Sequence, residues 1–213
     1  QHLGVRMPRF NPLLDELKTY PAVAVDRQKA KLIESGRPVF DFGKGDPEEP
    51  PPAFVGEALR NAVVPRLPYP TVRGSNEVRS TIAAYFERRF GVRLDPSSEI
   101  VPTSGSKEAV FHMPLLVVDR NAPDRGVVFP DPGYPAYHRG ALFSGGESIA
   151  VRLSGDHILR PQALDPAIIE RTRLIWLNSP HNPSGAVMSL ADLQAAADFC
   201  REKDILLVSD ETY

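Results

Sequence analysis

The sequence contains a single cysteine among its 213 residues, Cys200, which excludes an internal disulfide and a cysteine-based zinc cluster. No apolar run approaches the ~18 residues that a membrane-spanning helix needs, and no secretory signal pattern opens the chain. Neither sign of charge dominates, because 25 Lys and Arg residues stand against 27 Asp and Glu residues, without a block of like charge. These absences predict a cytoplasmic protein that has no metal site and does not bind nucleic acid or membranes.

The overall amino-acid composition is typical of a folded protein. Hydrophobic residues make up 42% of the chain and charged residues 24%, which is enough apolar material for a buried core. At about 150 residues per domain, the length allows one large domain, or one domain and a fragment of another. Residues 1–6 precede Met7 and are interpreted as a vector remnant, so they are left out of the fold prediction.

Proline is abundant, with 22 residues, and it separates segments that have the pattern of helices or strands. The sequence predicts helices at residues 53–64, 76–90, 106–118 and 189–203. The signals are apolar residues at helical spacing or an apolar composition, and in one case a Ser-x-x-Asp capping box. Short apolar runs predict strands at residues 126–129, 148–153, 174–177 and 205–208. This alternation predicts an α/β fold with a largely parallel sheet.

Polar segments follow two of the predicted strands. In an open parallel sheet, ligands bind beyond the carboxyl ends of the strands, which here lead into residues 178–185 (NSPHNPSG) and 209–213 (SDETY). A third segment, residues 102–109 (PTSGSKEA), leads into a helix whose first N–H groups lack intrahelical partners and would attract a phosphate. Because neither a P-loop nor a dinucleotide fingerprint is present, these segments predict a site for a mononucleotide or another monophosphate cofactor.

Each of these features also has an ordinary structural interpretation. Residues 104–107 could cap a helix without a ligand, Asp210 could be the N-cap of a following helix, and Tyr134 could be a packed loop aromatic. The remaining candidates are interpreted as structural: His112, His138, His157 and Cys200.

In their order and spacing, the motifs resemble the fold-type-I aminotransferases of class I and II, which use pyridoxal phosphate. The resemblance extends from about Val39 to the C-terminus, and Tyr69 and Gly74 fit its Tyr-x4-Gly segment. Within that family, residues 40–47 and 105–112 and the Pro-His-Asn-Pro form are most similar to succinyldiaminopimelate aminotransferases of bacterial lysine biosynthesis. The motifs that carry the family resemblance are GSKEA (105–109), DPGYP (131–135), NSPHNPSG (178–185) and SDETY (209–213).

The resemblance implies a domain arrangement. Residues 7–52 would form an N-terminal arm and part of a small domain, and residues 53–213 the first part of the cofactor-binding large domain, a mostly parallel sheet flanked by helices. The family's Schiff-base lysine and substrate-binding arginine would lie beyond Tyr213, so the chain is expected to be truncated before its C-terminal part and inactive by itself.

The resemblance also implies that four residues contact the cofactor ring. Asp210 would pair with the pyridine nitrogen and keep it protonated, so that the ring can accept electrons from the substrate. Asn182 and Tyr213 would donate to the phenolic oxygen, and Tyr134 would stack on the ring. Of these, Asp210 and Tyr213 would be catalytic.

Five further residues would hold the phosphate and the substrate. Gly105, Ser106 and Lys107 would bind the phosphate, and Tyr69 would reach the phosphate of the partner subunit in a homodimer. Gly45 would bring its backbone close to the substrate carboxylate.

The function implied is transamination between an amino acid, most specifically N-succinyl-LL-diaminopimelate, and 2-oxoglutarate or glutamate. An aspartate- or alanine-type aminotransferase, a C–S β-lyase on the same fold and a non-catalytic, cofactor-sensing domain of a transcription regulator stay open as alternatives. Two expectations concern geometry: the residues from Gly105 to Lys107, Tyr134, Asn182, Asp210 and Tyr213 converge on one cleft, and the Asn182–Pro183 peptide is cis.

Overall fold

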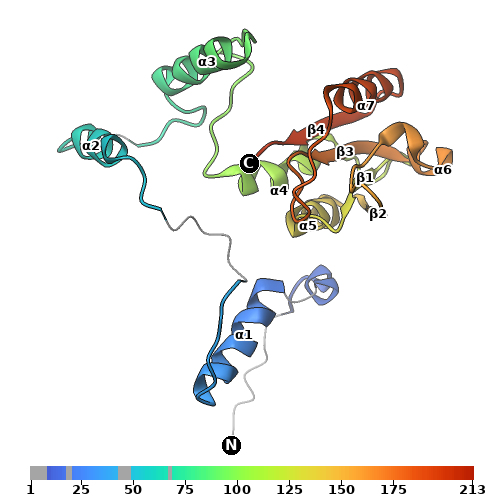
Figure 1. Cartoon of the computed structure of the whole chain (residues 1–213). Helices are drawn as coiled ribbons and strands as arrows, with labels where there is room; N and C mark the ends of the chain where they lie inside the picture. Colours follow the sequence, from blue (N-terminus) through green and yellow to red (C-terminus); the bar gives the residue numbers. More distant parts are fainter. Residues whose placement is uncertain (1–8, 18–20, 43–48, 67–68) are drawn as a thin grey trace, which may run out of the picture. The chain divides into compact units, whose positions relative to one another are not determined.

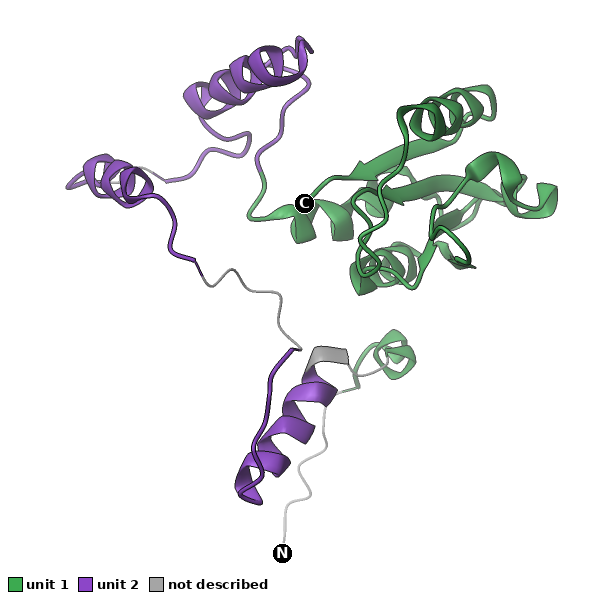
Figure 2. Ribbon diagram, in the orientation of Figure 1, with its two compact units in different colours: residues 1–18, 103–213 green, residues 19–102 purple. Residues whose placement is uncertain are grey.

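The computed structural model describes residues 9–17, 21–42, 49–66 and 69–213, and the chain divides into two compact units (Figure 2). One unit comprises residues 1–18 and 103–213, and the other comprises residues 19–102. Gly45 lies outside the described residues.

The larger unit is built on a four-stranded parallel sheet with the strand order β2-β1-β3-β4 (Figure 1). Its strands are β1 (Gly126–Asp131), β2 (Glu147–Arg152), β3 (Thr172–Asn178) and β4 (Leu206–Asp210). The two inner strands, β1 and β3, are almost entirely buried, which explains their continuous apolar sequence. All four predicted strands and their parallel arrangement are confirmed, with ends that differ by at most two residues.

Helices cover both faces of this sheet. Their bounds are α4 (Ser106–Val117), α5 (Pro135–Ser144), α6 (Pro166–Ile169) and α7 (Leu190–Glu202). The unit also contains short 3-10 helices at Pro12–Glu16 and Pro161–Ala163. Because neighbouring strand residues point to opposite faces, Val127 packs with residues of α4 and α5, whereas Val128 packs with residues of α7. The core therefore has two layers, one on each side of the sheet.

Cys200 lies in the layer beneath α7, where it is 1% exposed. Burial raises the pKa of its thiol to about 11, so the group is a neutral, apolar core side chain at physiological pH. The structural interpretation of this cysteine is confirmed.

Helix α5 is a departure from the sequence prediction, which placed no helix between the predicted strands at residues 126–129 and 148–153. The helix begins with Pro135, which is favoured at a first helical position because its missing N–H would have no partner there. It is also buried on several sides, so its sequence has only a weak amphipathic pattern.

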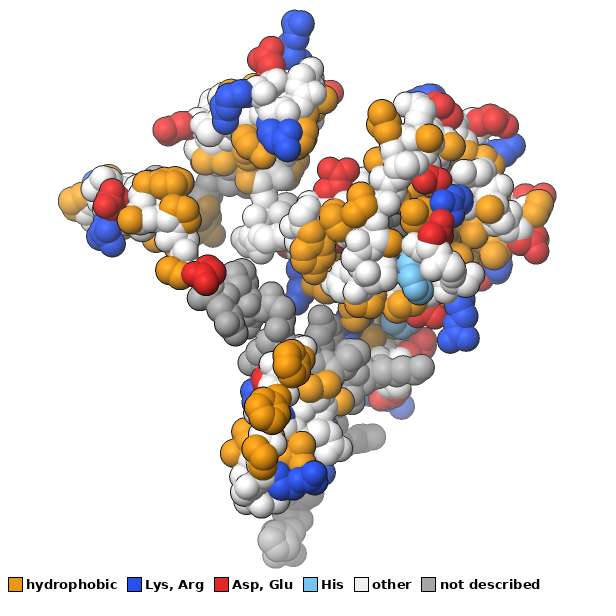
Figure 3. Space-filling model, in the orientation of Figure 1, with side chains coloured by type: hydrophobic (Ala, Val, Ile, Leu, Met, Phe, Trp, Pro, Cys, Tyr) orange, Lys and Arg blue, Asp and Glu red, His pale blue; other side chains and the backbone are white. Residues whose placement is uncertain are grey.

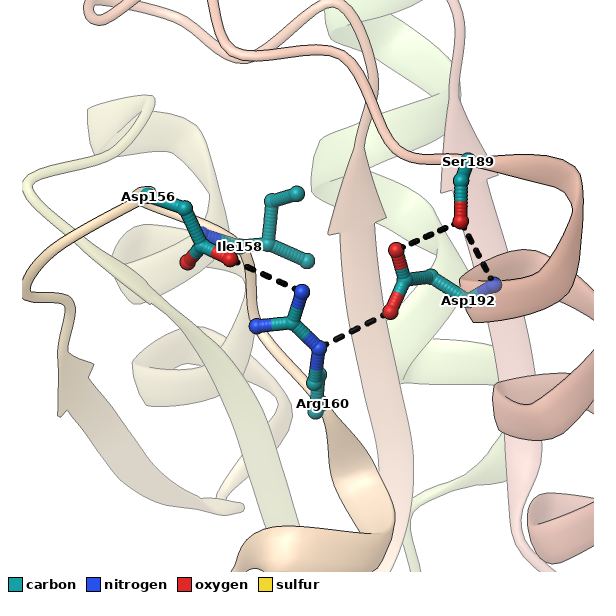
Figure 4. Close-up of polar contacts among 5 residues, drawn as sticks. All are labelled: Asp156, Ile158, Arg160, Ser189 and Asp192. Carbon is teal, nitrogen blue, oxygen red and sulfur yellow. Dashed lines mark hydrogen bonds and ion pairs between the residues drawn. The ribbon is translucent and has the colours of Figure 1, made fainter.

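The start of α7 is fixed by the predicted capping box and by an arginine from the segment between β2 and β3 (Figure 4). The Ser189 hydroxyl accepts from the Asp192 N–H at 3.1 Å and donates to the Asp192 carboxylate at 2.7 Å. Arg160 bridges two carboxylates, donating from Nε to Asp192 and from Nη2 to Asp156, each at 2.8 Å. The cluster ties the segment after β2 to α7.

This cluster predicts an acid-sensitive contribution to stability. Hydrogen bonds from Ser189 and Arg160 lower the pKa of Asp192, and the bond from Arg160 lowers the pKa of Asp156. A lowered native pKa gives stabilisation that is complete above the ordinary carboxyl value of about 4 and is lost as the pH falls through the native value. We expect the urea midpoints of wild type and Arg160→Leu to differ at neutral pH and to converge in acid.

The control for this experiment is Arg89→Leu, which removes a guanidinium that lies over the Phe90 ring, 5.1 Å from its centroid. Its difference from wild type should change little with pH. A difference for Arg160→Leu that stays constant from about pH 6 to about pH 2 would contradict the assignment.

The smaller unit contains three helices in its described residues: α1 (Pro21–Glu34), α2 (Ala53–Ala62) and α3 (Asn76–Phe90). Helices α2 and α3 were predicted, and α3 has the predicted bounds because the Ser75 hydroxyl caps its start and Gly91, with φ of 71°, ends it. Apolar side chains remain at the surface of these helices (Figure 3). They include Phe54 at 69% and Leu59 at 70% exposure. Within the described residues, no helix is long and apolar enough to cross a membrane.

Candidate active site

A cavity of about 160 Å³ lies at the carboxyl ends of the strands. Its lining comes from the start of α4, the segment before α5, the loop after β3 and the segment after β4. This is the edge at which a parallel sheet presents its ligand-binding loops. The structure brings together five of the residues that the sequence singled out: Ser106, Tyr134, Asn182, Asp210 and Tyr213.

A second hollow, of about 260 Å³, adjoins this cavity, because both are lined by Ser106, Asp210 and Thr212. It extends between α4 and β4, where its other lining residues include Met113 and Trp176. The shared edge therefore opens onto more volume than the first cavity provides.

The Asp210 carboxylate is held by two hydroxyl groups. Tyr137 donates to Oδ2 at 2.7 Å, and Thr212 donates to Oδ1 at 2.7 Å. Hydrogen bonds to an ionised acceptor are stronger than those between neutral groups. Asp210 is thus fixed in direction and still has unused lone pairs that could accept from a cationic ring nitrogen.

Tyr137 is a residue that the sequence analysis missed, since it lies on the unpredicted helix α5. Its ring stacks on Trp176, with centroids 5.0 Å apart and planes at 23°, and it meets Tyr134 edge-on at 5.8 Å. Burial, together with the hydrogen bond to Asp210, raises the pKa of Tyr137 far above its ordinary value. The phenol therefore stays protonated and is a permanent donor to Asp210.

The start of α4 offers its first N–H groups without a side-chain cap. Its N-cap is Gly105, whose φ of 88° lies in the region that other residues rarely adopt, although a Cβ there would meet no atom within 4 Å. The Ser106 hydroxyl lies 3.4 Å from the Thr212 hydroxyl, which places the helix start beside the Asp210 segment. Glycine is thus required here by backbone conformation and not by lack of space.

Asn178, at the end of β3, connects the two loops that carry Asn182 and Asp210. Its side-chain N–H donates to the Asp210 carbonyl at 2.9 Å, and its side-chain oxygen accepts from the Asn182 N–H at 2.7 Å. These contacts fix the orientation of the Asn178 amide and the position of Asn182. The Asn182–Pro183 peptide is cis, as predicted, and so are Asp131–Pro132 and Ser179–Pro180.

Three residues expected at the site are not among those lining the cavity. Gly105 and Lys107 flank Ser106 and are exposed, so the expected convergence of the whole segment holds for Ser106 alone. A side chain that follows Ser106 on a helix is turned by about 100° from it, which explains why Lys107 does not share its direction. Tyr69 belongs to the smaller unit and is 94% exposed.

The donor set in the cavity fits the chemistry of pyridoxal phosphate. Uncapped N–H groups and the Ser106 hydroxyl suit a phosphate. A fixed carboxylate, Asp210, suits a protonated ring nitrogen, Tyr134 offers an aromatic face, and Asn182 and Tyr213 offer donors for a phenolic oxygen. Among the described residues, no group of three His, Cys, Asp or Glu side chains could hold a metal ion.

Comparisons with known proteins agree with this arrangement. The chain is 35% identical to the LL-diaminopimelate aminotransferase of Aquifex aeolicus over 97% of its own length and 54% of that protein. It is 36% identical to the Gloeobacter violaceus enzyme of the same name, over 94% of this chain and 52% of that protein. The narrower resemblance to succinyldiaminopimelate aminotransferases finds no support in these names.

Solved structures show the same fold. Apo-BacF from Bacillus subtilis matches with a TM-score of 0.86 and 29% identity, over 96% of this chain and 52% of that one. Aspartate aminotransferase from Thermus thermophilus with maleate matches with a TM-score of 0.83 and 29% identity, over 97% of this chain and 54% of that one. The chain thus spans about half the length of its relatives.

The family described as aminotransferase class I and II matches residues 37–213, which include every described segment of the cavity. The predicted fold, a mostly parallel large-domain sheet flanked by helices, is confirmed by these comparisons and by the sheet itself. Members of this family use pyridoxal phosphate. The chain belongs to the class I and II aminotransferases.

Proposed function

We propose that this chain forms the first part of a pyridoxal-phosphate-dependent aminotransferase. The observation that carries the proposal is the placement of a doubly hydrogen-bonded carboxylate, Asp210, in one cavity with the uncapped start of α4 at Ser106. When bound, the cofactor supplies an electron sink for the bond cleaved at the substrate α-carbon. The chain supplies the groups that orient this ring and set its charge.

The roles follow from the chemistry of each side chain. Asp210 accepts from the ring nitrogen and keeps it protonated, while Tyr137 and Thr212 prevent the carboxylate from turning away. Asn182 and Tyr213, which line the cavity, would donate to the phenolic oxygen, and Tyr134 would offer an aromatic face to the ring.

The phosphate is assigned to the start of α4, where Ser106 lines the cavity and Gly105 and Lys107 flank it. Gly105, Ser106 and Lys107 bind the phosphate, the last as a charge at the helix start. The family resemblance assigns the substrate carboxylate to Gly45, which lies outside the described residues. Removal and return of the α-proton require a base, which the family resemblance places in a lysine beyond residue 213.

We propose a diaminopimelate as the amino donor and 2-oxoglutarate as the acceptor, in lysine biosynthesis. Two relatives that cover nearly all of this chain are named LL-diaminopimelate aminotransferases, which favours the free diamino acid over its N-succinyl form. The amino group passes from the diaminopimelate to 2-oxoglutarate, which becomes glutamate, and the diaminopimelate becomes the corresponding oxo acid. No other co-reactant is needed.

The experiment that tests this proposal uses the complete, cofactor-loaded protein with three amino donors, LL-diaminopimelate, N-succinyl-LL-diaminopimelate and aspartate, and separately with cystathionine as a β-lyase substrate. We expect glutamate to form fastest from LL-diaminopimelate, as measured with 2-oxoglutarate in excess. Preference for the succinyl form would instead support the succinyldiaminopimelate aminotransferase activity implied by the narrower resemblance. Release of a thiol from cystathionine without glutamate would indicate a β-lyase, and cofactor binding without any turnover would indicate a sensing domain.

We also propose that the complete protein is a homodimer in which Tyr69 binds the phosphate held by its partner. Tyr69 stands 94% exposed in a segment bounded by Pro65 and Pro70, where proline limits backbone freedom. Loss of one hydrogen bond to a charged group would cost about 0.5–3 kcal/mol. We expect Tyr69→Phe to weaken cofactor retention by that amount, measured by equilibrium dialysis.

A mixed dimer tests whether the contact crosses the interface. When a Tyr69→Phe chain pairs with an Asp210→Ala chain, a contact between subunits leaves one complete site, because the second chain donates its Tyr69 to the first. A contact within one subunit leaves none. Cofactor binding by a dissociated monomer with unchanged affinity would contradict the proposal.

A further inference from the structure

His181 is buried beside the candidate site without lining its cavity. The side chain is 4% exposed, and it lies in the loop between β3 and α7, directly before Asn182. Both ring nitrogens have partners: Nε2 lies 3.0 Å from the Pro132 carbonyl oxygen and Nδ1 lies 2.7 Å from the Ser184 hydroxyl. A buried histidine with two partners in two loops connects those loops.

The partners determine which nitrogen carries the proton. The Pro132 carbonyl can only accept, so Nε2 must be the donor, and neutral Nδ1 must then accept from the Ser184 hydroxyl. The Ser184 oxygen is free to accept from the Ala186 N–H, which it does at 3.2 Å. The chain of hydrogen bonds is consistent in one direction, from Ala186 through Ser184 and His181 to Pro132.

Burial supports the same protonation state. It lowers the pKa of His181 below its ordinary value, and the nearby His157 acts in the same direction, while the bond to the Pro132 carbonyl opposes them. The ring is therefore neutral at physiological pH, as its bonding pattern requires.

The loop of His181 is closed by its own backbone. The His181 N–H donates to the Ala186 carbonyl at 2.8 Å, and the Gly185 N–H donates to the His181 carbonyl at 2.7 Å. The imidazole leaves this turn and reaches the segment after β1, at a residue two positions before Tyr134. The bond from Nε2 therefore joins the segment that carries Tyr134 to the turn that carries Asn182.

We propose that His181 is a positioning residue for the cofactor: through its Nε2–H bond to the Pro132 carbonyl it sets the spacing between the Tyr134 ring and the Asn182 amide. This proposal rests on the proposed function, because the spacing matters for a ligand that contacts both residues at once. Loss of the bond leaves each loop folded but frees one to move relative to the other. The cost then appears in binding geometry and not in folding.

The test uses the complete protein, freed of cofactor and titrated with pyridoxamine phosphate and with pyridoxal phosphate. His181→Phe keeps the ring volume and removes both hydrogen bonds, whereas His181→Gln keeps an N–H donor near the position of Nε2. The matched control is His138→Phe, which removes a half-buried histidine that is bonded to the Ser148 hydroxyl at 2.7 Å and does not line the cavity.

We expect His181→Phe to weaken pyridoxamine phosphate binding about tenfold, and to shift the pH at which the absorbance of bound pyridoxal phosphate changes. His181→Gln should bind within about threefold of wild type, and His138→Phe should match wild type in both measurements. Unchanged affinity and spectrum in a folded His181→Phe protein would overturn the proposal. So would equal losses in His181→Gln and His181→Phe, because the effect would then come from packing.

A measurement on the wild-type protein covers the case in which His181→Phe does not fold. Nitrogen chemical shifts of ¹⁵N-histidine-labelled protein, assigned with Ser184→Ala, should show His181 neutral with the proton on Nε2. A proton on Nδ1 would overturn the proposal. Failure of the wild-type protein to bind either form of the cofactor would refute the proposed function itself, and this inference with it.

Discussion

Replacing Asp210 with asparagine is expected to lower kcat/KM of the complete enzyme by about 10²–10⁴, equivalent to about 3–6 kcal/mol of transition-state stabilisation. Asparagine has nearly the same shape and keeps an oxygen that can accept from Tyr137 or Thr212. It lacks the negative charge that keeps the ring nitrogen protonated, and that charge matters most when electrons move into the ring. The loss should therefore appear in kcat more than in folding.

Single-turnover kinetics with LL-diaminopimelate measure the chemical step, in which electrons move into the cofactor ring, without product release. The matched control is Asp198→Asn, which changes an exposed carboxylate of α7 that accepts from Gln194 at 3.0 Å and Arg201 at 2.7 Å. We expect that variant to react at the wild-type rate. A near-normal rate for Asp210→Asn would exclude the proposed role of the carboxylate.

Replacing Trp176 with alanine is expected to reduce the free energy of unfolding by about 3–5 kcal/mol. Trp176 is 2% exposed at the centre of β3, and its ring supports the ring of Tyr137 at 5.0 Å. Removal of the indole leaves a cavity beneath the residue that holds Asp210. Since domains are stable by about 5–15 kcal/mol in total, this is a large fraction of the margin.

Urea titration followed by circular dichroism measures the loss, and Trp176→Phe is the matched variant. Because Trp176 Nε1 has no hydrogen-bond partner among the described residues, phenylalanine loses no polar contact and keeps an aromatic face for Tyr137. We expect Trp176→Phe to lose much less stability than Trp176→Ala. Equal losses in the two variants would mean that the stacking contributes nothing.

The elements that the sequence predicted well are those with strong local signals. Helix α3 has a serine cap and a terminating glycine, and the buried strands β1 and β3 read as continuous apolar runs. Helix α5 escaped prediction because a proline start and a weakly amphipathic, buried sequence give no periodic pattern.

The residues of the candidate site also fall into a group that the sequence predicted and a group that it did not. Ser106, Tyr134, Asn182, Asp210 and Tyr213 were found through motifs that follow strands or begin a helix, and the parallel sheet places such positions at one edge. Tyr137, Asn178 and His181 were not assigned roles, because each acts through a partner far away in the sequence. Tyr137 and Asn178 act through Asp210, and His181 acts through Pro132.

By itself, the sequence determined the α/β class, the parallel sheet and the chemical types of the groups at its carboxyl edge, because these depend on local periodicity, capping and the residues that follow each strand. Only the tertiary structure decided that Tyr137 holds the Asp210 carboxylate, which nitrogen of His181 carries the proton, and that Lys107 does not line the cavity. Those properties depend on distances between segments that pack together from 49 to 106 residues apart. Local pattern carries no information about such distances, since they are set by how the two core layers close on the sheet.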